Sequence, residues 1–266
     1  MGENTKLLRS RMKSVDSTLR LTKAMGLVAS SKIRRATDAM EKARQYESAF
    51  TRAVERLASV RECQKSPYVQ AREAGKDLYV VIAGDRGLAG GYNANVFRHM
   101  REKGQVEIIA IGKRAADRYG NGYRSAEQFS AEDGTALAKE LCEKYVSGEY
   151  RSISVVGTHY LSMMSQEVSE RCVLPLAKSE AVPSGIIFEP DEATVLQQVA
   201  VEYVTAVIMR EVRESFASEV AARRVAMDSA GKNAQEMIDA LQLQYNRARQ
   251  GAITQEITEI VAGSGL

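Results

Sequence analysis

The sequence predicts an α/β protein: a long antiparallel left-handed coiled coil of N- and C-terminal helices plus a Rossmann-like α/β domain. Three observations support this: where proline and glycine occur, a heptad pattern at both ends, and short apolar runs in the middle. All four prolines lie between residues 67 and 190, and 13 of the 19 glycines lie between residues 61 and 190. Proline costs a helix interior about 3 kcal/mol and glycine about 1 kcal/mol relative to alanine, so both ends favour helix. We therefore expect an N-terminal shaft helix (1–60), an α/β globular domain (61–190) and a C-terminal shaft helix (191–266).

The N-terminal segment carries an apolar stripe with a heptad period. Alternating steps of four and three residues from Leu8 to Leu57 pass through fifteen positions, of which only Thr22 and Glu47 are polar. An apolar period of 3.5 residues keeps one face of a helix against one partner and produces a left-handed supercoil. Because a stripe that covers a compact core rarely extends past about 25 residues, we expect a coiled-coil partner.

The C-terminal segment supplies that partner. Its stripe begins at Met227 and continues in the same steps to Ala252, with many small residues along it. Small residues let two helix axes approach at the low end of the usual range of about 8–10 Å. The two segments also have opposite net charges, +7 for residues 1–60 and −4 for residues 191–266. Opposite charges favour two helices that lie side by side.

The helix lengths predict an uncovered C-terminal end. Helices over about residues 3–59 and 192–262 would measure roughly 85 and 105 Å at 1.5 Å per residue. Each has one end at the middle domain, so the C-terminal helix should extend about 20 Å beyond its partner. Exposed apolar faces mark binding surfaces, so this tip needs a binding site on another protein. Its apolar residues are Ile253, Ile257, Ile260 and Val261.

The middle of the chain alternates between strand and helix patterns, which indicates a parallel sheet flanked by helices. Apolar runs predict strands at 77–83, 106–111 and 152–157, with further strands at 168–176 and 185–188 on a sheet edge where proline is tolerated. Helical patterns cover 94–103 and 135–146.

The glycine-rich segment 84–91 invites a nucleotide-binding interpretation. However, Gly84, Gly87 and Gly90 do not have the G-x-G-x-x-G spacing, and no G-x-x-x-x-G-K-[ST] motif occurs in the chain. A structural strand-to-helix turn is therefore the favoured interpretation, with a phosphate site as the alternative. His159 is interpreted as a structural histidine, and Met163 with Met164 as core-filling residues.

Composition argues against several classes of protein. The net charge of +3 is too close to zero for an obvious nucleic-acid binder. The chain contains no apolar run of about 18 residues, so no membrane span is expected. Three cysteines without a C-x-x-C pair and only two histidines argue against a disulfide scaffold or a zinc site. A coiled-coil adaptor that binds nucleic acid through a basic helix stays an alternative, tested by the salt dependence of DNA binding. Its basic residues would be Arg9, Arg11, Lys13, Arg20, Lys23, Lys32, Arg34 and Arg35.

Three motifs resemble the gamma subunits of F-type ATP synthases. They are TKAMGLVASSK at 22–32, GDRGLAGG at 84–91 and YNRARQGAITQEITEIV at 245–261, and the resemblance covers the whole chain. The third motif is highly specific. The family's usual cysteine in the glycine-rich turn is Ala89 here, and the long insertion with a regulatory cysteine pair of chloroplast members is absent. Thiol regulation of that kind is therefore not expected.

The resemblance implies a central rotor that couples ion flow through the membrane sector to ATP synthesis or hydrolysis by rotation. It implies no catalytic residue, cofactor or metal in this chain. The implied partners are three alpha and three beta subunits, the epsilon subunit and the membrane c-ring, with one copy per complex, no nucleic acid and no membrane span. The implied location is the cytoplasmic side of the cell membrane, as a peripheral protein. The heptad register runs unbroken through the first thirty residues, which argues against a cleaved leader and for a bacterial origin.

The resemblance also assigns residues by motif. Met25, Arg223, Gln250, Thr254 and Glu256 match family positions associated with rotor–stator contact and coupling. The alternative function is a nucleotide-binding α/β enzyme with helical arms, which nucleotide binding by the isolated chain would support.

Overall fold

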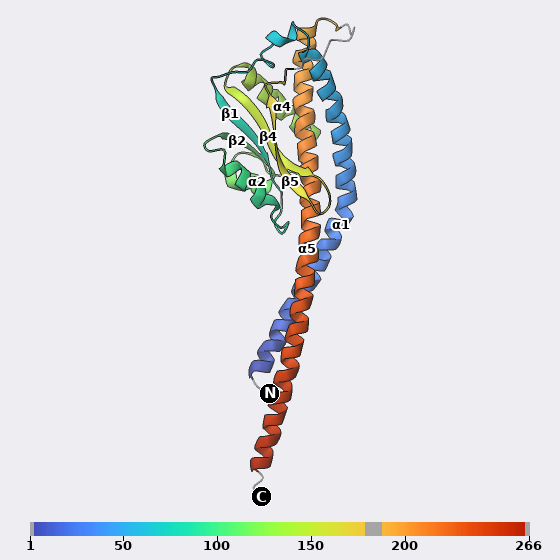
Figure 1. Cartoon of the computed structure of the whole chain (residues 1–266), viewed down its shortest axis with the longest axis vertical. Helices are drawn as coiled ribbons and strands as arrows, with labels where there is room; N and C mark the ends of the chain where they lie inside the picture. Colours follow the sequence, from blue (N-terminus) through green and yellow to red (C-terminus); the bar gives the residue numbers. More distant parts are fainter. Residues whose placement is uncertain (1–2, 179–187, 264–266) are drawn as a thin grey trace. The chain divides into compact units, whose positions relative to one another are not determined.

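The computed structural model of the chain describes residues 3–178 and 188–263 (Figure 1). The chain forms two compact units. One, the globular unit, is Ser30–Arg223; the other, the two-helix unit, combines Met1–Ala29 with Arg224–Leu266. Helices α1 (Glu3–Ala58) and α5 (Glu192–Gly263) each contribute to both units. The predicted limits of the two long helices are thus confirmed to within a residue.

Within its described residues, the globular unit contains a five-stranded sheet in the order β3-β2-β1-β4-β5. The first four strands in this order are parallel to one another, and the edge strand β5 is antiparallel to β4. The predicted strands are confirmed except for 185–188, because residues 185–187 lie outside the described part of the chain. The strands are β1 (Lys76–Ile82), β2 (Glu107–Ile111), β3 (Gly122–Tyr123), β4 (Tyr150–Tyr160) and β5 (Gln166–Leu174).

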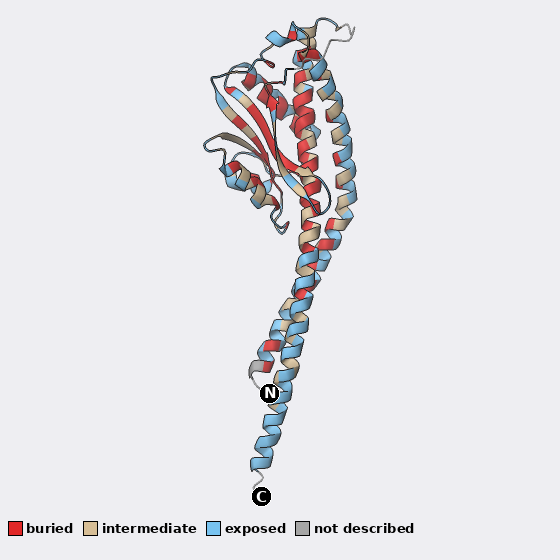
Figure 2. Ribbon diagram, in the orientation of Figure 1, coloured by how far each residue is buried: buried red, intermediate tan, exposed pale blue. Residues whose placement is uncertain are grey.

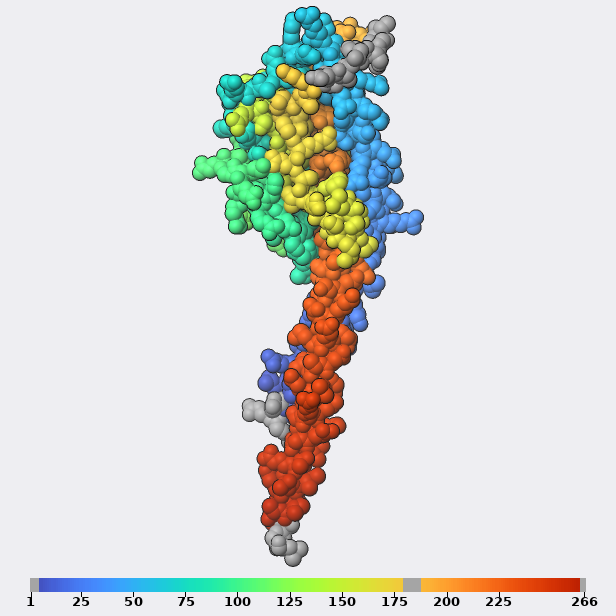
Figure 3. Space-filling model, viewed as in Figure 1, coloured from blue at the N-terminus to red at the C-terminus, as the bar shows by residue number. Residues whose placement is uncertain are grey.

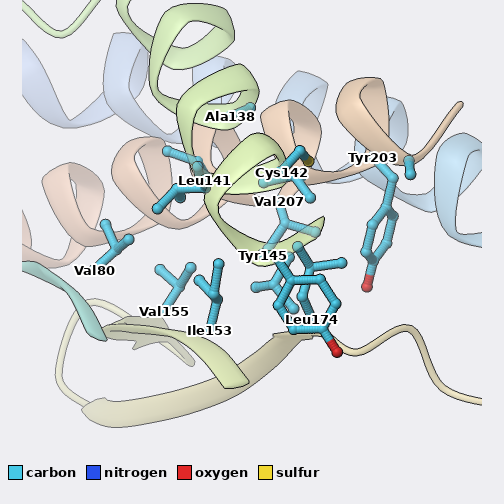
Figure 4. Packing of buried hydrophobic residues seen from close by; sticks show 14 of the residues in the cluster. Val80, Ala138, Leu141, Cys142, Tyr145, Ile153, Val155, Leu174, Tyr203 and Val207 are labelled. Carbon is cyan, nitrogen blue, oxygen red and sulfur yellow. The ribbon is translucent and has the colours of Figure 1, made fainter. Parts of the chain in front are cut away.

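Helices cover both faces of the sheet. One face packs against α4 (Ala131–Val146) and α5, together with the end of α1 (Figures 1 and 4). The other face packs against α2 (Tyr92–Arg101), with the short α3 (Lys113–Tyr119) beside it. In the main core, Figure 4 shows Leu141 and Tyr145 of α4 and Val207 of α5 facing the sheet. On the sheet side they meet Val80 of β1 and Ile153 and Val155 of β4.

Helix α5 has a different burial pattern in each unit (Figure 2). Within the globular unit, the six consecutive residues 203–208 are all buried. A helix that is buried all round belongs to a core. Within the two-helix unit only a stripe is buried or half-buried, and every described residue after Ala252 is exposed.

The seam of the two-helix unit is built on small residues. A Cβ added to Gly26 would lie 3.6 Å from Cβ of Met227, and one added to Gly231 would lie 3.6 Å from Oγ1 of Thr22. These contacts confirm that the N-terminal and C-terminal helices pack antiparallel along the predicted stripe. Within the described residues, no helix has both the length and the apolar character of a membrane span.

The prediction that Met163 and Met164 fill the core is wrong. Both lie in the tight turn between β4 and β5, where the backbone of Ser162 and Ser165 is hydrogen-bonded, and Met164 is 76% exposed. Two adjacent methionines are as apolar as core residues but show no helix or strand periodicity. The sequence alone therefore could not distinguish a position in the core from one at the tip of a hairpin.

A buried ion network joins α5 to its neighbours in the globular unit. Glu214 is fully buried and is approached by Arg44 Nη2 at 2.5 Å, His159 Nδ1 at 2.5 Å and Arg210 Nη2 at 2.8 Å. Burial would raise the pKa of Glu214, but its bonds to the two arginines and to a backbone N–H outweigh this and lower it. His159 therefore has the buried partner expected of a structural histidine.

The neighbouring carboxyl group of Glu211 behaves in the opposite way. Its Oε1 lies 2.5 Å from Arg210 Nη1, while its Oε2 is buried without a hydrogen-bond partner. Burial raises the pKa of Glu211 from its ordinary value of 4.5 to about 7, although Arg210 opposes the shift. The folded protein therefore holds this proton more tightly than the unfolded chain does. Stability from this group is present below about pH 4.5 and is lost as the pH rises to about 7.

Replacement of this carboxyl group should change how stability depends on pH. We expect Glu211→Gln to unfold at a temperature a few degrees higher than the native chain at pH 8, on the order of 1 kcal/mol, and to lose this advantage at pH 5. Thermal unfolding followed by circular dichroism across this pH range measures it. Glu202→Gln, at an exposed position on the same helix, is the control. An equal pH dependence in Glu211→Gln and the native chain would contradict the assignment.

Candidate functional site

The sheet has a point at which the strand order reverses, between β1 and β4. In doubly wound sheets, ligands bind in the crevice outside the carboxyl ends of the strands at such a point. Here Gly84 follows β1, and Thr158 lies near the end of β4. This crevice is therefore the place to test the nucleotide-binding alternative.

The chain's own helix α5 fills the crevice. Ser215 accepts a hydrogen bond from the Thr158 N–H at 2.9 Å, and its carbonyl accepts one from the Tyr92 hydroxyl at 2.9 Å. The carboxylate of Glu219 packs so closely on Gly84 that a Cβ there would lie 2.7 Å from its Cδ. The contacts favour the structural interpretation of the glycine-rich segment and leave the enzyme alternative without its usual site.

A carboxylate also takes the hydrogen bonds that a bound anion would need. Asp85 accepts from the N–H groups of Ala126 at 2.8 Å, Glu127 at 3.0 Å and Lys113 at 3.1 Å, and from the Ser125 hydroxyl at 2.7 Å. Burial would raise the pKa of Asp85, but these four bonds outweigh it and lower the pKa. The turn is therefore held by an internal anion.

Arg223 lies beside this turn. Its side chain pairs with Glu219, and its Nε and Nη2 both lie 3.3 Å from the carbonyl oxygen of Gly87. Only 9% of Arg223 is exposed. A role in coupling would therefore act through the turn that Arg223 holds.

Met25 lies in the two-helix unit and is half-buried. Leu21 and Val28, four residues before it and three after, are exposed. This spacing places all three on one side of α1, away from the buried stripe of Leu19 and Gly26. The prediction missed Leu21 and Val28, although their spacing forms a second, shorter apolar stripe that could have revealed them.

The C-terminal tip of α5 is the dark red end of the helix in Figure 3. Ile253, Ile257 and Ile260 follow the spacing of one helix face and are all exposed, Ile260 at 70%. Gln250, Thr254 and Glu256 are exposed as well. The Thr254 hydroxyl donates to the Gln250 carbonyl at 2.9 Å. Val261 is also exposed.

Comparison with known proteins fits this geometry. The family model described as ATP synthase matches residues 4–265. The sodium-ion-specific ATP synthase gamma chain of Acetobacterium woodii is 34% identical over 301 residues, which cover 99% of each chain. The chain belongs to the ATP synthase gamma-chain family. A second gamma chain, from Desulforamulus reducens, is 37% identical and covers 97% of this chain and 96% of its own.

Chains of two solved mitochondrial ATP synthase structures share the fold. A chain of the Euglena gracilis mitochondrial ATP synthase (OSCP/F1/c-ring, rotational state 3) superimposes with a TM-score of 0.69 at 19% identity, covering 100% of this chain and 97% of that one. A chain of the Tetrahymena thermophila mitochondrial ATP synthase central stalk and c-ring gives 0.60 at 18% identity, covering 79% and 99%.

The close approach of Glu219 to Gly84 predicts a steric effect. Gly84→Ala would place a methyl group against a buried, paired carboxylate, and we expect it to cost about 1–3 kcal/mol of unfolding free energy. Gly91→Ala is the matched control in the same turn, because a Cβ there would lie 3.6 Å from the Asn95 side chain, an ordinary contact. Chemical denaturation of both variants measures the difference. Equal stability of the two would show that the turn does not press on α5.

Proposed function

We propose that this gamma-family chain works as the central rotor of an F-type ATP synthase. It couples ion flow through the membrane sector to ATP synthesis or hydrolysis by turning inside a ring of catalytic subunits. One observation carries the proposal: after Ala252 the described end of α5 continues as an exposed helix with an apolar face. An exposed apolar face marks a binding surface, so we expect partner subunits to enclose this helix end and to let it rotate.

The exposed surface of α1 suits weak interactions with the ring that form and break repeatedly as the rotor turns. Exposed basic residues of α1, among them Arg11, Arg20 and Lys23, suit acidic levers on the ring. Each exposed ion pair contributes about 0–1 kcal/mol, so such pairs form and break without trapping the rotor. Met25, with Leu21 and Val28, supplies an apolar contact on the same helix.

The proposal assigns roles to the other motif residues. Gln250, Thr254 and Glu256 contact the ring near the tip, and Ile253, Ile257, Ile260 and Val261 form its apolar face. Arg223 supports coupling from inside the globular unit, through the glycine-rich turn. Residues 1–60 and 191–266 act as shaft helices and 61–190 as the α/β domain. No residue of this chain takes part in the chemistry of ATP.

The proposed complex contains one copy of this chain, three alpha and three beta subunits, an epsilon subunit and the membrane c-ring. The chain is a peripheral protein on the cytoplasmic side of the cell membrane. A middle-domain tag should recover this complex from native membranes with ATPase activity. Recovery of the chain alone, or with nucleic acid or a small ligand, would contradict the proposal.

The apolar tip gives a sharper test. Ile257→Asp adds a charge to the exposed apolar face, so the chain should fold normally while ATP-driven ion pumping by the complex falls about tenfold, as for an interface hot spot. Gln255→Asp, on the opposite side of the helix, is the matched control and should pump nearly as well as the native complex. Pumping in inverted membrane vesicles measures both. Normal pumping by Ile257→Asp would show that the tip needs no socket.

A further inference from the structure

Both long helices leave the globular unit beside the same pair of loops. Helix α1 enters this unit at Ser30, and Lys32, two residues later, pairs with Glu127. Helix α5 leaves the unit at Arg223, whose guanidinium group binds the Gly87 carbonyl. Glu127 and Gly87 lie in different loops, yet each contacts the charged residue of one long helix that lies nearest the boundary of the globular unit.

Asp85 joins the two loops. It belongs to the same turn as Gly87, and its carboxylate accepts hydrogen bonds from the N–H groups of Ala126 and Glu127. Arg86 adds a second link, with Nη2 3.7 Å from the Glu127 carboxylate. A continuous series of interactions therefore runs from α1 through both loops to α5.

The series is built to hold its shape. The Glu219 and Arg223 side chains are buried almost completely, and a planar guanidinium can bind a carboxylate and a carbonyl together. The Lys32–Glu127 pair is about one-third exposed on each side. Gly84 is needed because a side chain there would displace the Glu219 carboxylate.

We propose that Lys32, Glu127, Asp85, Arg223 and Glu219 form a clasp that fixes both shaft helices to the globular unit. The clasp makes torque applied to the globular unit turn both helices together. Its members are positioning residues, since they act through the helices they hold. The inference rests on the proposed rotor function.

The clasp is tested in the whole complex, with the number of ions pumped per ATP hydrolysed measured in inverted membrane vesicles. Lys32→Gln should lower this ratio by about threefold or more, as expected for a residue in a coupling network. Lys32→Arg keeps the charge that pairs with Glu127 and should restore the ratio. A merely structural role would change thermal stability and leave the ratio intact.

The α5 side of the clasp needs a variant that leaves no buried charge unpaired. The double variant Glu219→Gln/Arg223→Gln meets this need and should lower the ratio by a similar factor. Asp77→Asn is the matched control. It breaks the ion pair between Asp77 and Arg151 at 2.5 Å at the opposite end of β1 and should leave the ratio unchanged.

The outcomes separate the two proposals. A native ratio in Lys32→Gln and in the double variant would overturn the clasp and leave the rotor function standing. An equal loss in Lys32→Gln and Lys32→Arg, or in the Asp77→Asn control, would also overturn it. If the native complex hydrolyses ATP without pumping ions, the rotor proposal is wrong, and the clasp proposal, which rests on it, is wrong as well.

Discussion

The packing of helix α5 is the constraint on which the other features depend. In the globular unit α5 is a core helix, with residues such as Ala206, Val207 and Ala217 completely buried. Beyond Arg223 the same helix keeps only a narrow stripe against α1. No proline lies between residues 191 and 266, so its backbone hydrogen bonds run without a break from one unit to the other. One continuous helix therefore contributes to both units.

The same packing determines what occupies the crevice of this Rossmann-like sheet. The crevice at the carboxyl ends of β1 and β4 is where such sheets bind ligands. Here Ser215 and Glu219 of α5 occupy it, and the carboxylate of Asp85 uses the nearby N–H groups. The crevice that binds a ligand in other sheets of this kind here holds helix α5 of the same chain. The glycines of the turn allow a close approach of two parts of one chain.

Much of the fold could be predicted from the sequence because the long elements have strong periods. The stripe from Leu8 to Leu57 defined α1, and the absence of proline defined α5. Helix α3 and strand β3 were missed, since seven and two residues carry too little periodicity. The antiparallel direction of β5 depends on the turn over residues 161–165, between the end of β4 and the start of β5, which the composition did not reveal. Met163 and Met164 were misplaced for the same reason.

The candidate site was less predictable, because its parts come together only in three dimensions. The motif pointed to Arg223, but its burial and its bond to Gly87 depend on how α5 packs on the turn. Nothing in the sequence links Asp85 to Ala126 or Lys32 to Glu127, which lie 41 and 95 positions apart. By contrast, the exposed tip followed from helix lengths alone, because its position depends only on the rise per residue.

Direct observation of rotation is the measurement that tests the central claim. A bead can be attached through Met164→Cys, at the exposed tip of the β4–β5 hairpin, in a chain that also carries Cys172→Ser, with the catalytic ring fixed to a surface. The account predicts that the bead turns in one direction for as long as ATP is supplied. Continued ATP hydrolysis with a stationary bead would contradict it.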